Sequence, residues 1–284
     1  MPTYVYDGSF EGLLSCVFTA FENKEIPHAI VEEQHHQFTL LDNAMHVAAD
    51  EELAARVLKG VDDRTANQAS ELLYKMYLSE LPQIELIIFH LIKAIVAKRN
   101  DKILENFGNE YILKASQIER MIHREVHRMH AFVRFQKANT GIFYAAIDPD
   151  FNVLPLIGDH FERRYADQPW IIVDTKRHYG LHYNLTDTRF IKLDDPVFNF
   201  SNGDLKQEII DDKEKIYQSL WENYFHSVNI QERKNPKLHL RHVPKRYWKY
   251  LIEKSCRLKN WLSLKPQVSP GNYAENRYEI YTKK

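Results

Sequence analysis

The most chemically distinctive residues lie in a cationic stretch near the end of the chain. Residues 233–259 hold ten lysines and arginines and one acidic residue, Glu253, and aromatic residues occupy positions 247, 248 and 250. Lysine and arginine neutralise phosphates and release counterions, and aromatic rings stack on exposed bases. The stretch predicts a nucleic-acid contact; the alternative is a solvated helix whose aromatic residues enter the core. The predicted contact residues are Arg233, Lys234, Lys237, Arg241, Lys245, Arg246, Trp248 and Lys249.

The charge of the whole chain supports this interpretation. The 284 residues carry 38 lysines and arginines against 39 acidic residues, a formal net charge of −1. Residues 1–115, however, hold 10 basic and 18 acidic residues, which leaves −8 there and +7 in the remainder. Such an asymmetry indicates that the basic end meets a polyanion. The alternative is a protein-interaction scaffold in which the basic end pairs with the acidic half of the same chain.

A second cationic surface is predicted on a long helix at about residues 109–137. At about 100° per residue, its histidines and arginines fall on one arc and its apolar residues on the other. The basic arc predicts a phosphate-facing surface carried by Arg124 and Arg128, or an ordinary solvated face. Histidines 123, 127 and 130 have a spacing that can hold a metal. We nevertheless predict no metal and no cofactor, because Arg124 stands where a zinc-protease motif needs glutamate and the arginines repel cations.

Glu125 lies in the middle of the apolar arc of this helix. A carboxylate in apolar surroundings must find a partner or lose its charge. The next predicted helix offers Arg163 and Arg164 as partners, so we predict a buried ion pair. The alternative is that Glu125 acts as a general acid or base.

The segment from His160 to Tyr179 is dense in polar and aromatic residues. Asp174 ends an apolar strand and, together with His160, could activate a water for glycosidic cleavage. A base-recognition pocket could instead use Trp170 or Tyr179 for stacking and Gln168 for hydrogen bonds. The simplest alternative is a polar hairpin packed on its helix. The catalytic candidates of the chain are therefore Glu125, His160 and Asp174.

The hydrophobic periodicity predicts an α+β fold: a mostly helical N-terminal half, a small central antiparallel sheet with a covering helix, and a helical basic C-terminal part. We expect a mainly helical region at 1–140, a sheet-plus-helix region with a basic C-terminal helix at 141–265, and a loosely ordered tail at 266–284. The predicted strands are 3–7, 37–41, 142–148, 170–174 and 179–183. The helices are expected to start at Ser9, Asp50, Asn67, Pro82, Asn109, Leu154, Asp204 and Pro244.

Several classes of protein are excluded. No apolar run approaches the roughly 20 residues that span a bilayer, so we expect no membrane contact. The two cysteines, Cys16 and Cys256, lie far apart, which disfavours a disulfide framework and favours a cytoplasmic location. The chain lacks the GxxxxGK[ST], GxGxxG, CxxxCxxC and GxSxG patterns, so NTPase, dinucleotide-binding, radical-SAM and serine-hydrolase chemistry are not expected within it.

Three stretches, YDGSFEGLLSCVFTAFE, PLIGDHFERRYADQPWIIVDTKRHYGLHY and NIQERKNPKLHLRHVPKRYW, resemble a bacterial family of DNA-metabolism or DNA-repair proteins of unknown biochemical function. The resemblance runs from Tyr4 to about Tyr250. It implies a partner, because members are typically encoded beside a radical-SAM protein thought to act in DNA repair, and some relatives are fused to a uracil-DNA-glycosylase-like domain. It implies no catalytic residues.

These observations predict a DNA-binding protein of DNA repair or modification that holds or presents DNA to a radical-SAM partner. The alternatives are an enzyme acting on DNA itself, such as a glycosylase-like hydrolase, and a protein-interaction scaffold.

Overall fold

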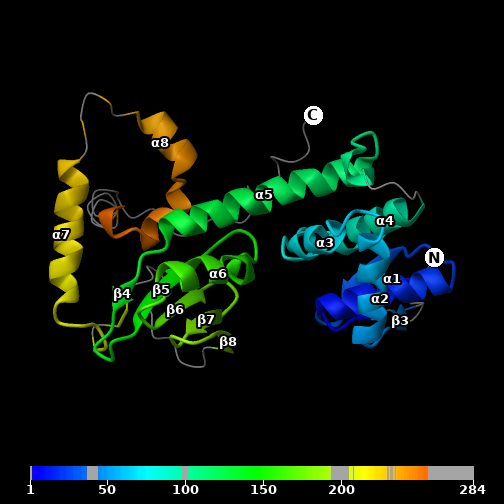
Figure 1. Cartoon of the computed structure of the whole chain (residues 1–284), viewed down its shortest axis with the longest axis horizontal. Helices are drawn as coiled ribbons and strands as arrows, with labels where there is room; N and C mark the ends of the chain where they lie inside the picture. Colours follow the sequence, from blue (N-terminus) through cyan, green and yellow to red (C-terminus); the bar gives the residue numbers. More distant parts are fainter. Residues whose placement is uncertain are drawn as a thin grey trace, which may run out of the picture. The chain divides into compact units, whose positions relative to one another are not determined.

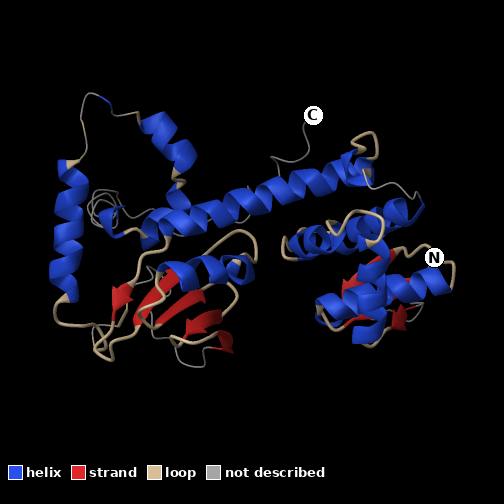
Figure 2. Cartoon of the chain, in the orientation of Figure 1, coloured by secondary structure: helices blue, strands red, loops and turns tan. Residues whose placement is uncertain are grey.

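The computed structural model describes residues 2–36, 44–97, 102–192, 205–206, 208–228, 230, 233 and 235–254 (Figure 1). The predicted strand at 37–41, the predicted contact Lys234 and the predicted tail at 266–284 lie outside these residues. The chain divides into two compact units, each built from two separate stretches of sequence. The first unit holds residues 1–131 and 148–166, and the second holds residues 132–147 and 167–284. The fold class is mixed α and β, as predicted, and each unit has its own sheet (Figure 2). None of the described helices has both the length and the apolar composition needed to cross a bilayer.

The first unit begins with a three-stranded parallel sheet that the sequence predicted only in part. Its strands are β1 (Thr3–Tyr6), β2 (Ala29–Glu32) and β3 (Ala44–His46), in the order β2-β1-β3. The alternation of β1 was recognisable, whereas β2 and β3 are short and lack it. Helix α1 (Phe10–Glu22) starts at the predicted cap, because the Ser9 hydroxyl oxygen accepts a hydrogen bond from the Gly12 N–H at 2.9 Å.

The helices of the first unit follow the predicted periodicity closely. They are α2 (Glu51–Asp62), α3 (Ala69–Tyr77), α4 (Ile84–Ala97), α5 (Glu110–Phe132) and α6 (Leu154–Arg164), with short 3-10 turns at Glu33–His35 and Ile103–Glu105. Asp50 caps α2 by accepting from the N–H groups of Glu52 and Leu53. Helix α5 ends five residues before the predicted boundary at Lys137. The reason is that Gln136 and Lys137 form a short strand that pairs with residues 143 and 144.

The second unit contains a five-stranded sheet in the order β4-β5-β6-β7-β8. The strands are β4 (Gln136–Lys137), β5 (Phe143–Ile147), β6 (Trp170–Asp174), β7 (Tyr179–Tyr183) and β8 (Thr188–Lys192). The sheet is mixed rather than antiparallel, as β5 and β6 pair in parallel. Parallel neighbours need a long crossover connection, and the segment that contains α6 provides it. All five residues of β6 are buried, so this strand is the centre of the core.

Beyond the sheet, two predicted helix boundaries are wrong. Helix α7 (Glu214–Ser227) starts ten residues after the predicted Asp204, because Ile210 instead forms a bridge with Ala138 and Leu205 is buried. The predicted helix at Pro244 is replaced by α8 (Pro236–His242) and a 3-10 helix, η4 (Lys245–Tyr250). Since a 3-10 helix has three residues per turn, Lys245 and Lys249 lie about 120° apart rather than on one face.

Candidate nucleic-acid interface

Helix α8 presents the first group of predicted contact residues. The Asn235 side chain caps the helix by accepting a hydrogen bond from the Leu238 N–H at 3.0 Å, and Pro236 is tolerated in the first turn because it has no N–H to lose. Lys237 and Arg241 are one turn apart on this helix, and both are exposed. Arg233, just before the helix, is exposed as well. These cations therefore face solvent.

The 3-10 helix η4 adds Lys245 and Arg246, which are also exposed. Its anchor is Tyr247, which is 2% exposed and packs against the Phe132 ring, with ring centroids 5.3 Å apart. The Arg246 guanidinium lies 4.5 Å from the centroid of the same Tyr247 ring. Tyr247 therefore belongs to the core, which is the alternative that the sequence left open for the aromatic residues. Trp248 and Lys249 are half-buried.

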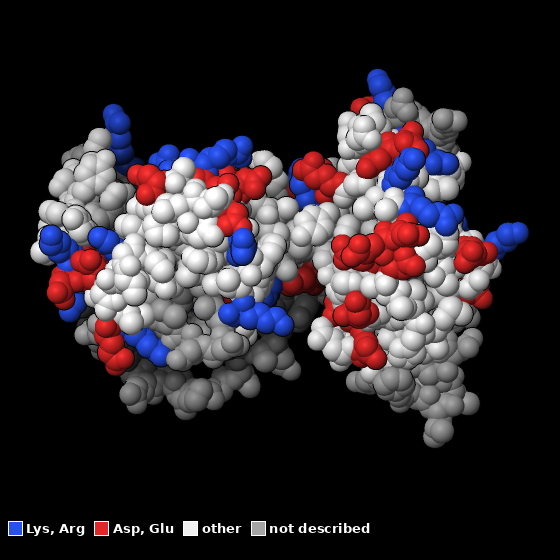
Figure 3. Space-filling view, turned by 60° about the horizontal axis from the view of Figure 1, so that its bottom comes forward, with Lys and Arg blue, Asp and Glu red and all other residues white. Residues whose placement is uncertain are grey.

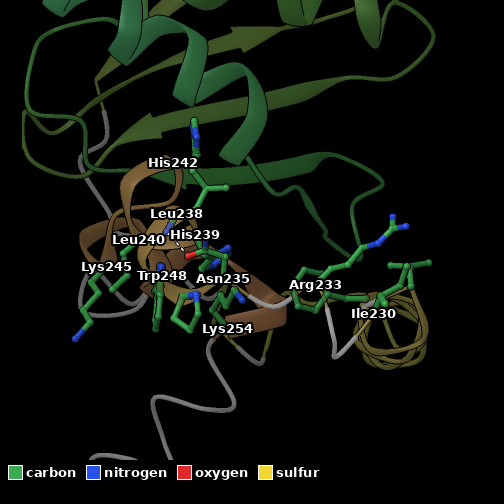
Figure 4. Close-up of a pocket in the computed structure, with 13 residues that line it drawn as sticks. Ile230, Arg233, Asn235, Leu238, His239, Leu240, His242, Lys245, Trp248 and Lys254 are labelled. Carbon is green, nitrogen blue, oxygen red and sulfur yellow. Dashed lines mark hydrogen bonds between the residues drawn. The ribbon is translucent and has the colours of Figure 1, made fainter.

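A groove of about 670 Å³ lies between the end of α7, α8 and η4 (Figure 4). Figure 4 shows Lys245 on the left and Arg233 with Ile230 on the right, with His239 and Trp248 between them. The Trp248 indole N–H donates to the Val243 carbonyl at 3.0 Å, which fixes the ring. Cations thus flank an apolar surface. The apolar side chains of the lining are Phe225, Val228, Ile230, Pro236, Leu238, Leu240 and Trp248.

The acidic residue of this region, Glu253, is engaged elsewhere. It is 8% exposed, and its carboxylate accepts from Arg134 Nη2 at 2.9 Å and from the Trp221 indole N–H at 3.0 Å. Burial alone would raise the pKa of Glu253, but the hydrogen bond and charge of Arg134 outweigh it and hold that pKa below the usual range. Glu253 is therefore ionised and paired with Arg134. Lys254 is the inward-facing exception among the cations, with its Nζ 4.6 Å from the Phe225 ring centroid.

The charge of the first unit has the opposite sign. Figure 3 shows groups of acidic side chains on the face of this unit that the view exposes. Its own cationic arc on α5 is only partly available. Arg124 is exposed, and its Nε donates to the Arg120 carbonyl within the helix. Arg128 is half-buried and paired with Glu125, so it is a poorer candidate for a phosphate contact.

Glu125 forms the predicted buried ion pair, but with a different partner. The residue is 1% exposed; one carboxylate oxygen lies 3.3 Å from Arg128 Nη1 and the other accepts from the Asp150 N–H at 3.0 Å. The predicted partners Arg163 and Arg164 are exposed instead. Arg128 has the advantage of lying one turn away on the same helix.

His160 stacks on His130, with ring centroids 3.9 Å apart and planes inclined by 16°. Burial, followed by the charges of His160, His127 and His123, lowers the pKa of His130 to about 4. Burial, followed by Arg164 and Arg163, also lowers the pKa of His160. Both rings therefore favour the neutral form, because a charged imidazole is poorly solvated here and repelled by its neighbours.

This pair makes folding stability depend on pH. Because the folded pKa of His130 lies below the unfolded value of 6.5, the unfolded chain binds the proton more readily. We expect the free energy of unfolding to be highest above that value and to fall as the pH drops toward 4. His130→Phe keeps a stacked ring and is expected to flatten this fall, measured by urea denaturation across the range. His28→Phe, which alters an exposed histidine, should leave the profile unchanged; an unaltered profile in His130→Phe would contradict the assignment.

Asp174 is fully buried and serves the β6–β7 hairpin. Its oxygens accept from the N–H groups of Lys176 at 2.9 Å and Arg177 at 3.1 Å, and from Arg177 Nη1 at 2.8 Å. Burial raises the pKa of Asp174, while the charge and hydrogen bonds of Arg177 oppose that rise. His160 belongs to the first unit and Asp174 to the second, so their pairing stays a prediction.

The alternative base-recognition pocket loses one of its two predicted stacking residues, Trp170, while Tyr179 is half-buried. Trp170 is fully buried and stacks on Tyr183, with ring centroids 5.5 Å apart, so its face is not available to a base. Sequence reasoning also missed residues that the structure exposes. These are aromatic residues of α7: Tyr217, Trp221 and Tyr224 have exposed fractions of 58%, 40% and 58%. Their helical spacing, i, i+4 and i+7, was a usable signal.

Comparison with protein-family models places most of the chain in a known family. A domain of unknown function, DUF4130, matches residues 82–253, which is more than half of the chain. The matched region contains α5, the five-stranded sheet and the cationic α8–η4 segment. No curated protein matches the chain.

Proposed function

The chain belongs to the DUF4130 family, whose description gives no function, and we propose from the chain's own residues that it binds DNA. The proposed contact is the cationic surface of α8 and η4. The observation that carries the proposal is that these cations are exposed while the acidic residue among them, Glu253, is buried against Arg134. The cationic surface comprises Arg233, Lys237, Arg241, Lys245 and Arg246.

The electrostatics of this surface are suited to a phosphate chain. Within the second unit, no described carboxylate forms an ion pair with Arg233, Lys237 or Arg241, so their charges are not neutralised by their own unit. Clustered exposed cations repel one another, and a polyanion relieves this repulsion while releasing its counterions. A linear polyanion can also contact several of the cations at once.

The enzyme alternative has less support from the geometry. Both candidate carboxylates, Glu125 and Asp174, are buried and accept backbone and guanidinium hydrogen bonds, so their bonding explains their burial without a substrate. We therefore propose that the chain holds DNA rather than cleaves it. From the family resemblance we further propose that the chain presents this DNA to a radical-SAM partner for repair or modification. A pull-down with that partner, with and without DNA, tests this part of the proposal.

The binding proposal predicts a large effect of charge removal. In the variant Arg233→Gln/Lys237→Gln/Arg241→Gln, DNA affinity is expected to fall about 100-fold at about 0.1 M salt. The slope of log affinity against log salt should become shallower by about 2 to 3, since each lost phosphate contact removes about 0.7 on a single strand and about 0.9 on a duplex. Fluorescence anisotropy of labelled DNA with the full chain, over a range of salt concentrations, measures both quantities.

The matched control removes three exposed cations elsewhere. Lys59→Gln/Arg163→Gln/Lys192→Gln makes the same change in net charge away from the cationic surface, and it should alter the affinity and the slope much less. Thermal unfolding of both variants establishes that each is folded. Equal losses in the two variants, or wild-type binding with no salt dependence, would refute the proposed contact.

A further inference from the structure

Helix α7 carries an exposed aromatic stripe. At about 100° per residue, Tyr217, Trp221 and Tyr224 fall within an arc of about 60° on α7. Val228 directly follows the last helical residue and continues the stripe, since its N–H still donates to the Tyr224 carbonyl. The exposed fractions of these four residues are 58%, 40%, 58% and 54%. Val228, at the end of the stripe, also lines the groove beside α8. The stripe therefore leads along α7 into that groove.

The surroundings of the stripe are suited to an anion. Glu222 lies about 140° around the helix from Tyr217. Glu214, at the start of the helix, is 6% exposed and accepts from the Lys137 N–H and from Gln218. The guanidinium of Arg134 lies 5.6 Å from the Trp221 ring centroid. Arg134 is itself paired with Glu253, so the pair adds no net charge beside the rings. Of the two carboxylates of α7, that of Glu222 points away from the stripe and that of Glu214 is buried, so neither repels an anion there.

We infer that the DNA bound by this protein is single-stranded: unpaired bases stack on the aromatic stripe and enter the groove, while the phosphates contact the cationic surface. The inference rests on the proposed function and goes beyond it by assigning the strandedness. Exposed cations alone bind any polyanion, whereas exposed aromatic rings add affinity only where base faces are open. In a duplex those faces are covered by neighbouring bases. The groove, at about 670 Å³, lies within the usual range for small-molecule sites, about 300–1,000 Å³.

The charge pattern favours this occupant over a protein. A second copy of the chain or another protein could also cover the stripe, but the exposed Arg233 that lines the groove would then require an acidic partner face. A single strand supplies regularly spaced negative charge and apolar base faces in one molecule.

The test compares three labelled probes on the full chain: an oligo(dT) strand, a strand of the same length without bases, and a duplex. We expect oligo(dT) to bind about tenfold tighter than the other two, the effect of losing about one base–aromatic stack. Tyr217→Ala/Tyr224→Ala should remove that preference and leave the baseless strand bound as before. Tyr217→Phe/Tyr224→Phe should restore it, because the rings remain. Trp221 is left in place since its N–H donates to Glu253.

Phe190→Ala is the matched control, because it removes a 61% exposed ring from β8, at the other edge of the five-stranded sheet from β4. Equal, salt-dependent binding of all three probes would overturn the single-strand inference and leave the proposed function intact. No salt-dependent binding of any probe would overturn both. If Tyr217→Ala/Tyr224→Ala instead converts a dimer to a monomer in sedimentation while binding to oligo(dT) is unchanged, the stripe is a protein interface and the inference is wrong.

Discussion

Asp174→Ala is expected to lower the free energy of unfolding by about 3–5 kcal/mol, the usual cost of breaking a buried ion pair on one side. The substitution leaves the Arg177 guanidinium, whose side chain is 10% exposed, without its carboxylate, and it leaves two N–H groups of the hairpin without an acceptor. Urea denaturation of the full chain measures the loss.

Two variants sharpen this prediction. Asp174→Ala/Arg177→Ala should cost less than twice the single change, because removing both charges leaves neither one buried alone. Asp187→Ala removes an exposed carboxylate from Arg189 in the same sheet and should change stability little. A stable Asp174→Ala protein that has lost an activity on DNA would show instead that the carboxylate is catalytic.

Glu125→Ala is expected to lower the free energy of unfolding by about 3 kcal/mol, near the lower end of the range for one-sided loss of a buried pair. The cost is smaller than at Asp174 because Arg128 is 28% exposed and can turn toward water once its partner is gone. The remaining cost comes from the Asp150 N–H, which loses its acceptor. Thermal or urea unfolding provides the measurement.

The conservative change separates the two contacts of Glu125. Glu125→Gln keeps an oxygen that can accept from the Asp150 N–H and loses only the charge, so it should cost clearly less than alanine. Glu119 lies on α5 like Glu125, and its 45% exposed carboxylate pairs with Lys75 of α3. Glu119→Ala is therefore the control and should cost little. Equal stabilities of wild type, Glu125→Gln and Glu125→Ala would contradict the buried pair.

Both expected results bear on function. If Asp174 and Glu125 only stabilise the fold, His160 is the one predicted catalytic candidate left to the hydrolase alternative. His160 stacks on His130, and burial lowers its pKa. The conservative variants Asp174→Asn and Glu125→Gln, once shown to be folded, should then bind DNA as the wild type does. The cationic surface and the hairpin would be separable parts of the same molecule.

Local rules in the sequence predicted much of the secondary structure. Ser9 and Asp50 cap their helices as expected, since a short polar side chain before an apolar-periodic run can accept from the free N–H groups. Strands 170–174 and 179–183 match β6 and β7. The helical period alone placed Glu125 on the buried face of α5. Each of these features depends on residues within one or two turns of one another.

The sequence by itself determined the helix caps, the buried carboxylate and the density of positive charge near residues 233–254, because these depend on neighbouring residues and on composition. Tertiary structure decided the rest. It selected Arg128 over Arg163 as the partner of Glu125, ended α5 where Gln136 pairs with β5, and paired β5 with β6 in parallel. It also buried Tyr247 and left Tyr217 in solvent. Both residues are tyrosines in amphipathic segments, and whether such a ring is covered depends on contacts with residues far away in the chain, which a local pattern does not contain.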